Sequence, residues 1–121
     1  MRRSPILPNA DLKITDLDAD AQQQALIDFA KFYIRHFRSN DLEILSQYKV
    51  DYAMNDINHY LYVNRSFSPA ELAAGVLEYK REMFLEILKT VDLAYNADGR
   101  LKGNTWKAWY LQEYAAIAPG I

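Results

Sequence analysis

Lys80 has the position in this sequence that most suggests chemistry. It interrupts an apolar series spaced three and four residues apart, which predicts a place on the buried face of a helix. The apolar members of the series are Ala73, Leu77, Phe84 and Ile87. A buried ammonium must be paired or neutral, because removing its charge from water is costly. Lys80 could hold an anion or act as a neutral amine. Alternatively, its stem packs while its nitrogen reaches solvent, or it sets the register between helices.

Asp56 and His59 are three residues apart, so their side chains share one face of a predicted helix. Di-metal bundles use Glu-x-x-His on two helices, whereas this sequence has one Asp-x-x-His and no Glu-x-x-His. We therefore expect a hydrogen-bonded structural histidine rather than a metal ligand. Glu113 lies within the aromatic face of the last helix and could pair with Lys80 or with an arginine. A pocket formed by Asp56, His59, Lys80 and Glu113 is the alternative site.

Other chemical motifs are missing from the sequence. It contains no cysteine, no glycine-rich phosphate loop and no Ser-His-Asp pattern. The acidic run from Asp16 to Asp20 begins like a calcium loop, but Ala21 and Ile27 stand where that loop requires glycine and glutamate. Acidic residues at a helix start explain the run better. We expect no catalytic residue, no bound metal and no cofactor.

The composition excludes several classes of protein. Half of the residues are apolar and a quarter are charged, as in an ordinary globular protein, and 121 residues suffice for one core. The net charge of −2 gives no electrostatic basis for general nucleic-acid binding. No run approaches the ~20 apolar residues of a membrane span, and no secretory signal follows Arg2 and Arg3. We therefore expect a cytoplasmic protein that does not bind membranes, and the lack of cysteine is compatible with that compartment.

The hydrophobic pattern predicts an all-α, compact four- to five-helix bundle. Residues 1–16 contain Pro5 and Pro8 and are expected to form an extended arm over the bundle, while residues 17–121 form a single helical domain. Helices are predicted over 20–37, 41–63 and 105–117, the second one either breaking near 50–51 or contacting neighbours on two sides. Residues 68–95 are predicted to form one unbroken helix of roughly 40 Å, capped by Ser68, that serves as the spine.

Basic residues form a stripe on the first predicted helix. Lys31, Arg35 and Arg38 follow one another at helical spacing, with Asp28 on the same side. A phosphate-binding role for Arg35 and Arg38 is conceivable. The stripe is better interpreted as a solvated face, because a helix that packs on one side presents its charges on the other.

Large apolar residues outside the main faces point to a contact surface. Leu85 lies away from the apolar face of the predicted spine, Tyr62 lies off the main face of the second helix, and the last helix gathers aromatic rings on one face. The candidates for partner binding are Tyr62, Leu85, Trp106, Trp109 and Tyr110. Aromatic anchors dominate protein interfaces. The other explanation is a central spine packed on more than one side.

These observations favour a non-catalytic protein–protein interaction module, such as an adaptor, an inhibitor or immunity-type protein, or a small assembly subunit. The expected partner is another protein, with a second copy of the chain as one candidate. The alternative is a helical bundle that binds a small ligand or a metal, with or without enzymatic activity, in an interhelical pocket around His59, Asp56 and Lys80.

Overall fold

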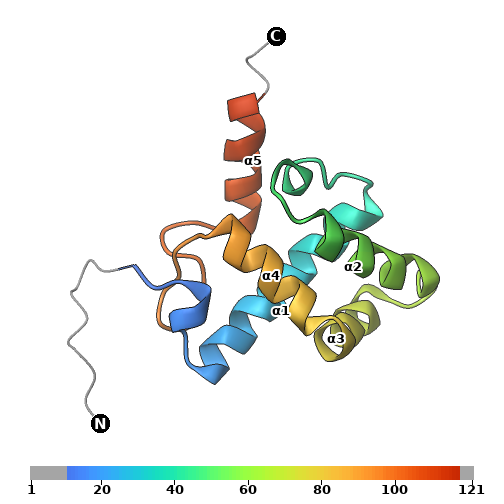
Figure 1. The fold of residues 1–121 in the computed structure, drawn as a ribbon, viewed down its shortest axis with the longest axis horizontal. Coiled ribbons are helices and arrows are strands. Elements are labelled where there is room, and N and C mark those ends of the chain that lie inside the picture. The colour runs from blue at the N-terminus through green and yellow to red at the C-terminus, as the bar shows by residue number, and fades with distance from the viewer. Residues whose placement is uncertain (1–10, 118–121) are drawn as a thin grey trace.

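The long helix α1 (Ala19–Arg38) passes through the middle of the fold, and the other helices are arranged around it (Figure 1). The structure is a computed structural model that describes residues 11–117. The remaining elements, in chain order, are η1 (Ile14–Asp16), η2 (Leu45–Gln47), α2 (Asp51–Val63), α3 (Pro69–Tyr79), α4 (Arg81–Val91) and α5 (Trp106–Ile117). The expected all-α bundle of four to five helices is confirmed.

α1 forms where the sequence predicts a helix, and local chemistry explains both of its ends. The Asp18 carboxylate accepts a hydrogen bond of 2.8 Å from the Ala21 backbone N–H, so part of the acidic run is a helix cap. Arg35 and Arg38 lie in the last turn, where positive charge suits the helix dipole. Between the two ends, Leu26 and Phe29 are fully buried in the core.

Aromatic rings form the centre of the core. The Phe29 ring contacts the Phe84 ring edge to face, at 5.5 Å between centroids, and lies 4.8 Å from the Trp106 ring. Tyr33 packs against Phe84 in the same way, at 5.4 Å. These rings come from α1, α4 and α5, so a single cluster ties the first, fourth and last helices together.

The predicted unbroken helix over residues 68–95 is wrong. The chain breaks at Lys80, whose backbone (φ −125°, ψ 23°) ends α3 and precedes α4. A straight 28-residue rod would extend well past α1, which at ~1.5 Å per residue is only ~30 Å long. The break lets Val76 of α3 and Ile87 of α4 both reach the core, where each is fully buried. α4 ends at Val91, and the next residue, Asp92, has a left-handed φ of 58°.

The cap predicted at the start of this region is present. Ser68 Oγ accepts from the Glu71 N–H at 3.2 Å, and Glu71 Oε1 accepts from the Ser68 N–H at 2.8 Å. The helix predicted over 41–63 is broken near residues 50–51, which is one of the two alternatives that its apolar pattern left open. Residues 48–50 separate the short η2 turn from the helix α2, which begins after Val50, so the region does not form one continuous helix.

The first ten residues of the predicted arm lie outside the described residues. Leu12 pairs with Tyr95 in an isolated antiparallel bridge, and Tyr95 pairs in turn with Leu101. Ile14 is buried, and it begins the 3-10 turn η1, so the last three residues of the predicted arm are not extended. The turn that includes Gly99 docks against the start of α1, where a side chain on Gly99 would overlap the Ala21 carbonyl group.

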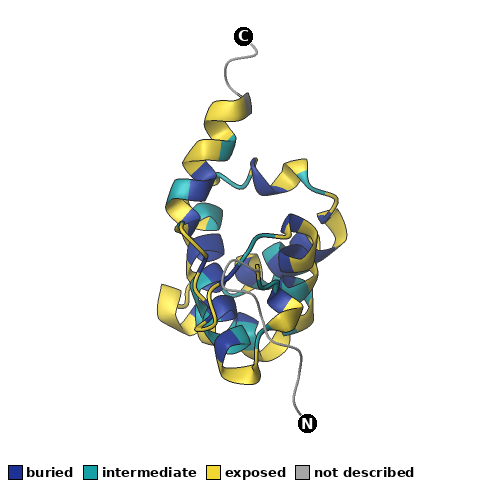
Figure 2. Ribbon diagram, turned by 90° about the vertical axis from the view of Figure 1, so that its left-hand side faces the viewer, coloured by how far each residue is buried: buried dark blue, intermediate teal, exposed yellow. Residues whose placement is uncertain are grey.

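α5 projects away from the other helices (Figure 1). Its first turns are buried against the core through Trp106, Trp109 and Tyr110. Further along the helix, Leu111 and Tyr114 are exposed, and the outer half of the helix is covered by solvent on most sides (Figure 2). Within residues 11–117, no helix combines the length and the apolar character needed to cross a bilayer.

Candidate functional site

The four polar residues of the alternative pocket do not form one site. Lys80 Nζ lies 2.9 Å from Asp56 Oδ1, and both side chains are partly exposed. His59 is exposed, and Glu113 instead accepts a 3.1 Å hydrogen bond from the Tyr48 hydroxyl. Lys80 lies at the junction between α3 and α4, so it is not on the buried face of a helix as predicted. Residues 11–117 contain no group of three or more potential metal-ligating side chains.

Most of the candidates for partner contact belong to the core of this chain. Trp106, Trp109 and Tyr110 are at most 8% exposed, and Leu85 is half-buried against the core. The aromatic face of α5 covers α1, which explains the gathering of rings without a partner. Tyr62 differs from the others, since 59% of its surface is exposed near the end of α2.

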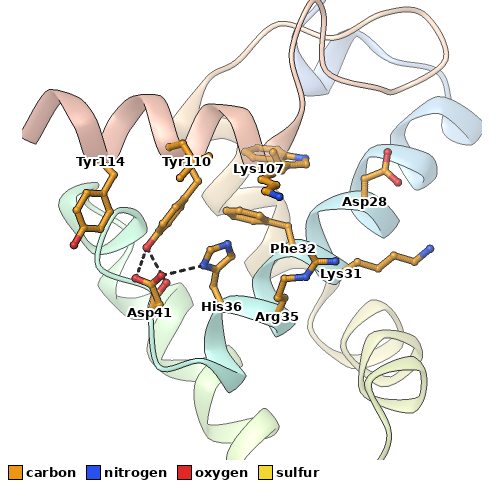
Figure 3. A pocket seen from close by; sticks show the side chains of 11 residues that line it. Asp28, Lys31, Phe32, Arg35, His36, Asp41, Lys107, Tyr110 and Tyr114 are labelled. Carbon is orange, nitrogen blue, oxygen red and sulfur yellow. Dashed lines mark hydrogen bonds and ion pairs between the residues drawn. The ribbon is translucent and has the colours of Figure 1, made fainter.

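A cleft between α1 and α5 is one of two cavities that residues 11–117 form beside α1, and it is the one whose lining combines aromatic, acidic and basic side chains (Figure 3). It has a volume of about 530 Å³. α1 contributes Asp28, Lys31, Phe32, Arg35 and His36, Asp41 follows α1, and α5 contributes Trp106, Lys107, Tyr110, Leu111 and Tyr114. The buried rings of Phe32, Trp106 and Tyr110 form its floor, while Leu111 and Tyr114 stand exposed at its edge.

Asp41 links the two walls of the cleft. The Tyr110 hydroxyl donates to Asp41 Oδ1 at 2.6 Å, and His36 Nδ1 lies 3.6 Å from Asp41 Oδ2 (Figure 3). The hydrogen bond from Tyr110, assisted by attraction to His36, lowers the pKa of the Asp41 carboxyl. Burial, followed by the hydrogen bond to Asp41, raises the pKa of Tyr110. In this network the neutral Tyr110 hydroxyl therefore donates a hydrogen bond to the ionised Asp41 carboxylate.

The His36 ring is fixed between two aromatic side chains. Its centroid lies 4.2 Å from that of Tyr110 and 4.5 Å from that of Phe32. The Asp41 carboxylate lies on its Nδ1 side at 3.6 Å, which is beyond hydrogen-bond distance. This arrangement places a polar but rigid group within a mainly aromatic floor.

Three cationic side chains lie on the side of the cleft away from Asp41 and Tyr114 (Figure 3). Lys31, Arg35 and Lys107 line the cleft and are exposed. The ion pairs found among residues 11–117 use other lysines and arginines, so these three have no carboxylate partner within that part of the chain. Asp28, which also lines the cleft, accepts a 2.9 Å hydrogen bond from Gln24.

A second cavity lies on the other side of the same stripe of α1. It has a volume of about 590 Å³ and is closed by the start of α3, through Pro69, Ala70 and Ala73. Lys31 and Arg35 line both cavities, and Arg38 lines the second. The basic stripe that the sequence analysis assigned to a solvated face is thus a ridge between two hollows.

No protein-family model, curated protein or solved structure matches this chain. What the cleft can do must therefore be read from its geometry. It offers an apolar floor, a rigid carboxylate–histidine group and three cations without a carboxylate partner in the described chain. Such a surface can recognise an apolar side chain or ring accompanied by negative charge.

Proposed function

We propose that this chain is a non-catalytic protein-binding domain and that its partner occupies the cleft between α1 and α5. The observation that carries the proposal is the pairing of an aromatic floor with exposed apolar residues and cations at the edge. Leu111 and Tyr114 project from the part of α5 that the other helices leave uncovered. Interfaces are enriched in aromatic residues and arginine, and residues of this kind dominate their binding energy.

The polar groups of the cleft favour binding over catalysis. The Tyr110 hydroxyl is engaged by both the carboxylate and the carbonyl oxygen of Asp41, at 2.6 and 2.9 Å. Among the residues that line the cleft there is no serine, threonine or cysteine to act as a nucleophile beside His36. Asp41 therefore serves as a tie between α5 and the end of α1.

A small anionic ligand is the second candidate occupant. A volume of about 530 Å³ lies within the usual range of small-molecule sites, and the polar groups converge on an apolar floor. This candidate takes the place of the pocket expected around Asp56, His59, Lys80 and Glu113. Native mass spectrometry of the purified protein distinguishes it, since a retained small molecule that is lost on Tyr110→Ala substitution would favour a ligand over a protein partner.

Two apolar residues with nearly equal exposure provide the main experiment. Leu111 at the cleft and Tyr62 near the end of α2 are 58% and 59% exposed, respectively. Leu111→Glu and Tyr62→Glu should therefore change the surface to a similar degree while leaving the core intact. Circular dichroism and thermal unfolding check that both variants are folded. Each variant and the wild type are then used to capture proteins from the lysate of the source cells, followed by quantitative mass spectrometry.

The proposal expects a protein that the wild type and Tyr62→Glu retain and that Leu111→Glu loses. Loss with Tyr62→Glu alone would place the partner near the end of α2 and would contradict the proposed site. If no protein distinguishes either variant from the wild type, the protein-binding proposal fails. Sedimentation velocity over a dilution series tests a second copy of the chain as the partner, because Leu111→Glu should then abolish a dimer.

A further inference from the structure

The cations without polar partners are concentrated at one place on the surface. Five lysines and arginines have no ion pair, hydrogen bond or ring contact within residues 11–117. They are Lys31, Arg35, Arg38, Lys49 and Lys107. All except Lys49 line the two cavities beside α1. A cluster of unpaired positive charges attracts and orients a negatively charged partner.

The two cavities differ in their chemistry. The one against α3 carries Lys31, Arg35 and Arg38, contains no acidic residue and is otherwise lined by small or apolar residues. The one against α5 has the aromatic floor, and there Asp28 and Asp41 partly offset the cations. Negative charge is therefore favoured over the basic ridge and towards α3, and apolar groups are favoured on the α5 side.

From this polarity we infer that the partner presents an acidic segment to the ridge formed by Lys31, Arg35 and Arg38. An apolar side chain of the same segment enters the cleft between α1 and α5. The inference rests on the proposed function and deepens it by naming the chemistry of the partner. A carboxylate can pair with an arginine through two parallel hydrogen bonds, so an acidic segment would use donors of Arg35 and Arg38 that have no polar partner in the described chain.

The spacing of the ridge fits an extended segment. Lys31 and Arg35 are separated by one helical turn, which is a rise of ~6 Å along α1. In an extended chain, residues two apart lie on the same side at a separation of ~6.6 Å. Two acidic residues separated by one residue can therefore face Lys31 and Arg35 together. Arg38 lies ~4.5 Å further along the axis, within reach of the same carboxylates.

A polynucleotide fits the ridge less well. The Phe32, Trp106 and Tyr110 rings pack against one another and expose at most 8% of their surface, so the cleft floor can take one side-chain-sized group but offers no row of exposed rings on which successive bases could stack. Asp28 and Asp41 would also face a polyphosphate backbone across the cleft. These features favour a peptide, because its acidic side chains can lie over the ridge while its apolar side chain enters the cleft.

A displayed library of random twelve-residue peptides, selected on the immobilised wild-type chain, tests the inference. The selected peptides are expected to be enriched in aspartate and glutamate next to a leucine or an aromatic residue. Labelled copies are then titrated by fluorescence anisotropy with Lys31→Glu and with Lys49→Glu. Both substitutions replace an exposed, unpaired lysine and change the net charge equally, but Lys49 lies at a different cavity.

The inference expects Lys31→Glu to weaken binding about tenfold or more and Lys49→Glu to change it less than about twofold. Arg38→Gln provides a second test at the end of α1, should Lys31→Glu not fold, and is expected to weaken binding in the same direction. Equal weakening by Lys31→Glu and Lys49→Glu would reveal a general charge effect and overturn the inference. So would a selection that enriches no acidic peptides, or tighter binding of a labelled single-stranded oligonucleotide.

These results are separable from the test of the proposed function. If Leu111→Glu loses a captured protein while the selected peptides are not acidic, the cleft binds a partner and the inferred acidic segment is wrong. If acidic peptides are selected and Lys31→Glu weakens them, but Leu111→Glu loses no captured protein, the ridge binds acidic segments and the proposed role of the cleft is wrong.

Discussion

The Tyr110 hydroxyl lies 2.6 Å from Asp41 Oδ1 and 2.9 Å from the Asp41 carbonyl oxygen. Tyr110 is in α5 and Asp41 is in the segment that follows α1, so this contact joins elements that are 69 residues apart in the chain. It ties α5, on one side of the candidate cleft, to the segment that follows α1 on the other.

Tyr110→Phe is expected to lower the free energy of unfolding by about 1–3 kcal/mol, because a hydrogen bond to a charged group is lost while the ring remains. Urea denaturation followed by circular dichroism measures the change. Tyr114→Phe, on the same helix but exposed, is the matched control and should change stability by less than about 0.5 kcal/mol. Equal stability of Tyr110→Phe and the wild type would contradict the proposed tie.

The same contact gives the protein a pH dependence. The pKa of Asp41 is lowered below its ordinary value of 3.8 in the folded state, mainly by the hydrogen bond from Tyr110. Its stabilising contribution is therefore complete above that value and is lost as the pH falls through the folded pKa. Tyr110→Phe should flatten the loss of stability below about pH 4, as measured by urea denaturation at a series of pH values. Parallel pH curves would contradict this assignment.

Two buried tyrosines should respond to removal of the hydroxyl in opposite directions. The Tyr95 hydroxyl is buried and has no hydrogen-bond partner in the described chain, whereas Tyr33 donates to Asn58 Oδ1 at 2.7 Å. Tyr95→Phe is expected to raise the free energy of unfolding by about 1 kcal/mol, and Tyr33→Phe to lower it by a similar amount. Thermal and urea unfolding measure both. A loss of stability in Tyr95→Phe would indicate a partner for that hydroxyl.

Gly99 and Gly103 both have positive φ angles, of 95° and 65°, but their surroundings differ. A Cβ on Gly99 would overlap the Ala21 carbonyl group, while a Cβ on Gly103 would meet no atom within 4 Å. Gly103→Ala should cost about 1 kcal/mol, which is the price of a left-handed alanine. Gly99→Ala should cost about 1–3 kcal/mol more, because the start of α1 must shift. Similar unfolding curves for the two variants would contradict the close docking of this turn on α1.

The ion pair at the α3–α4 junction should be weak. Lys80 and Asp56 have side chains that are 25% and 36% exposed, so water screens their attraction. A double-mutant cycle with Lys80→Met and Asp56→Asn is expected to give a coupling energy of up to about 1 kcal/mol. A coupling of several kcal/mol would contradict this expectation and show that water does not screen the pair.

Several features of the fold follow from local sequence patterns. Ser68, Pro69 and Glu71 specify a helix start through hydrogen bonds within one turn, and the capping box is present. The apolar period of residues 20–37 correctly predicts α1, since one buried face is enough to mark a helix. Lys80 and Asp56 were expected in one pocket, but with Glu113 as the candidate partner of Lys80, and a local pattern could not show that Lys80 pairs with Asp56, 24 residues away.

The break at Lys80 has no local marker, since neither proline nor glycine stands there and the apolar spacing continues across it. The break lets Val76 and Ile87 both reach the core, and helix propensity is a weak preference that such packing can override. The cleft also could not be predicted from the sequence, because it forms only when distant segments pack together. On an isolated helix, Lys31, Arg35 and Arg38 would form a solvated stripe. They become the wall of two cavities when α3 and α5 close on either side. A periodic pattern records which face of a helix is apolar, but it does not record which distant segments lie beside the polar face.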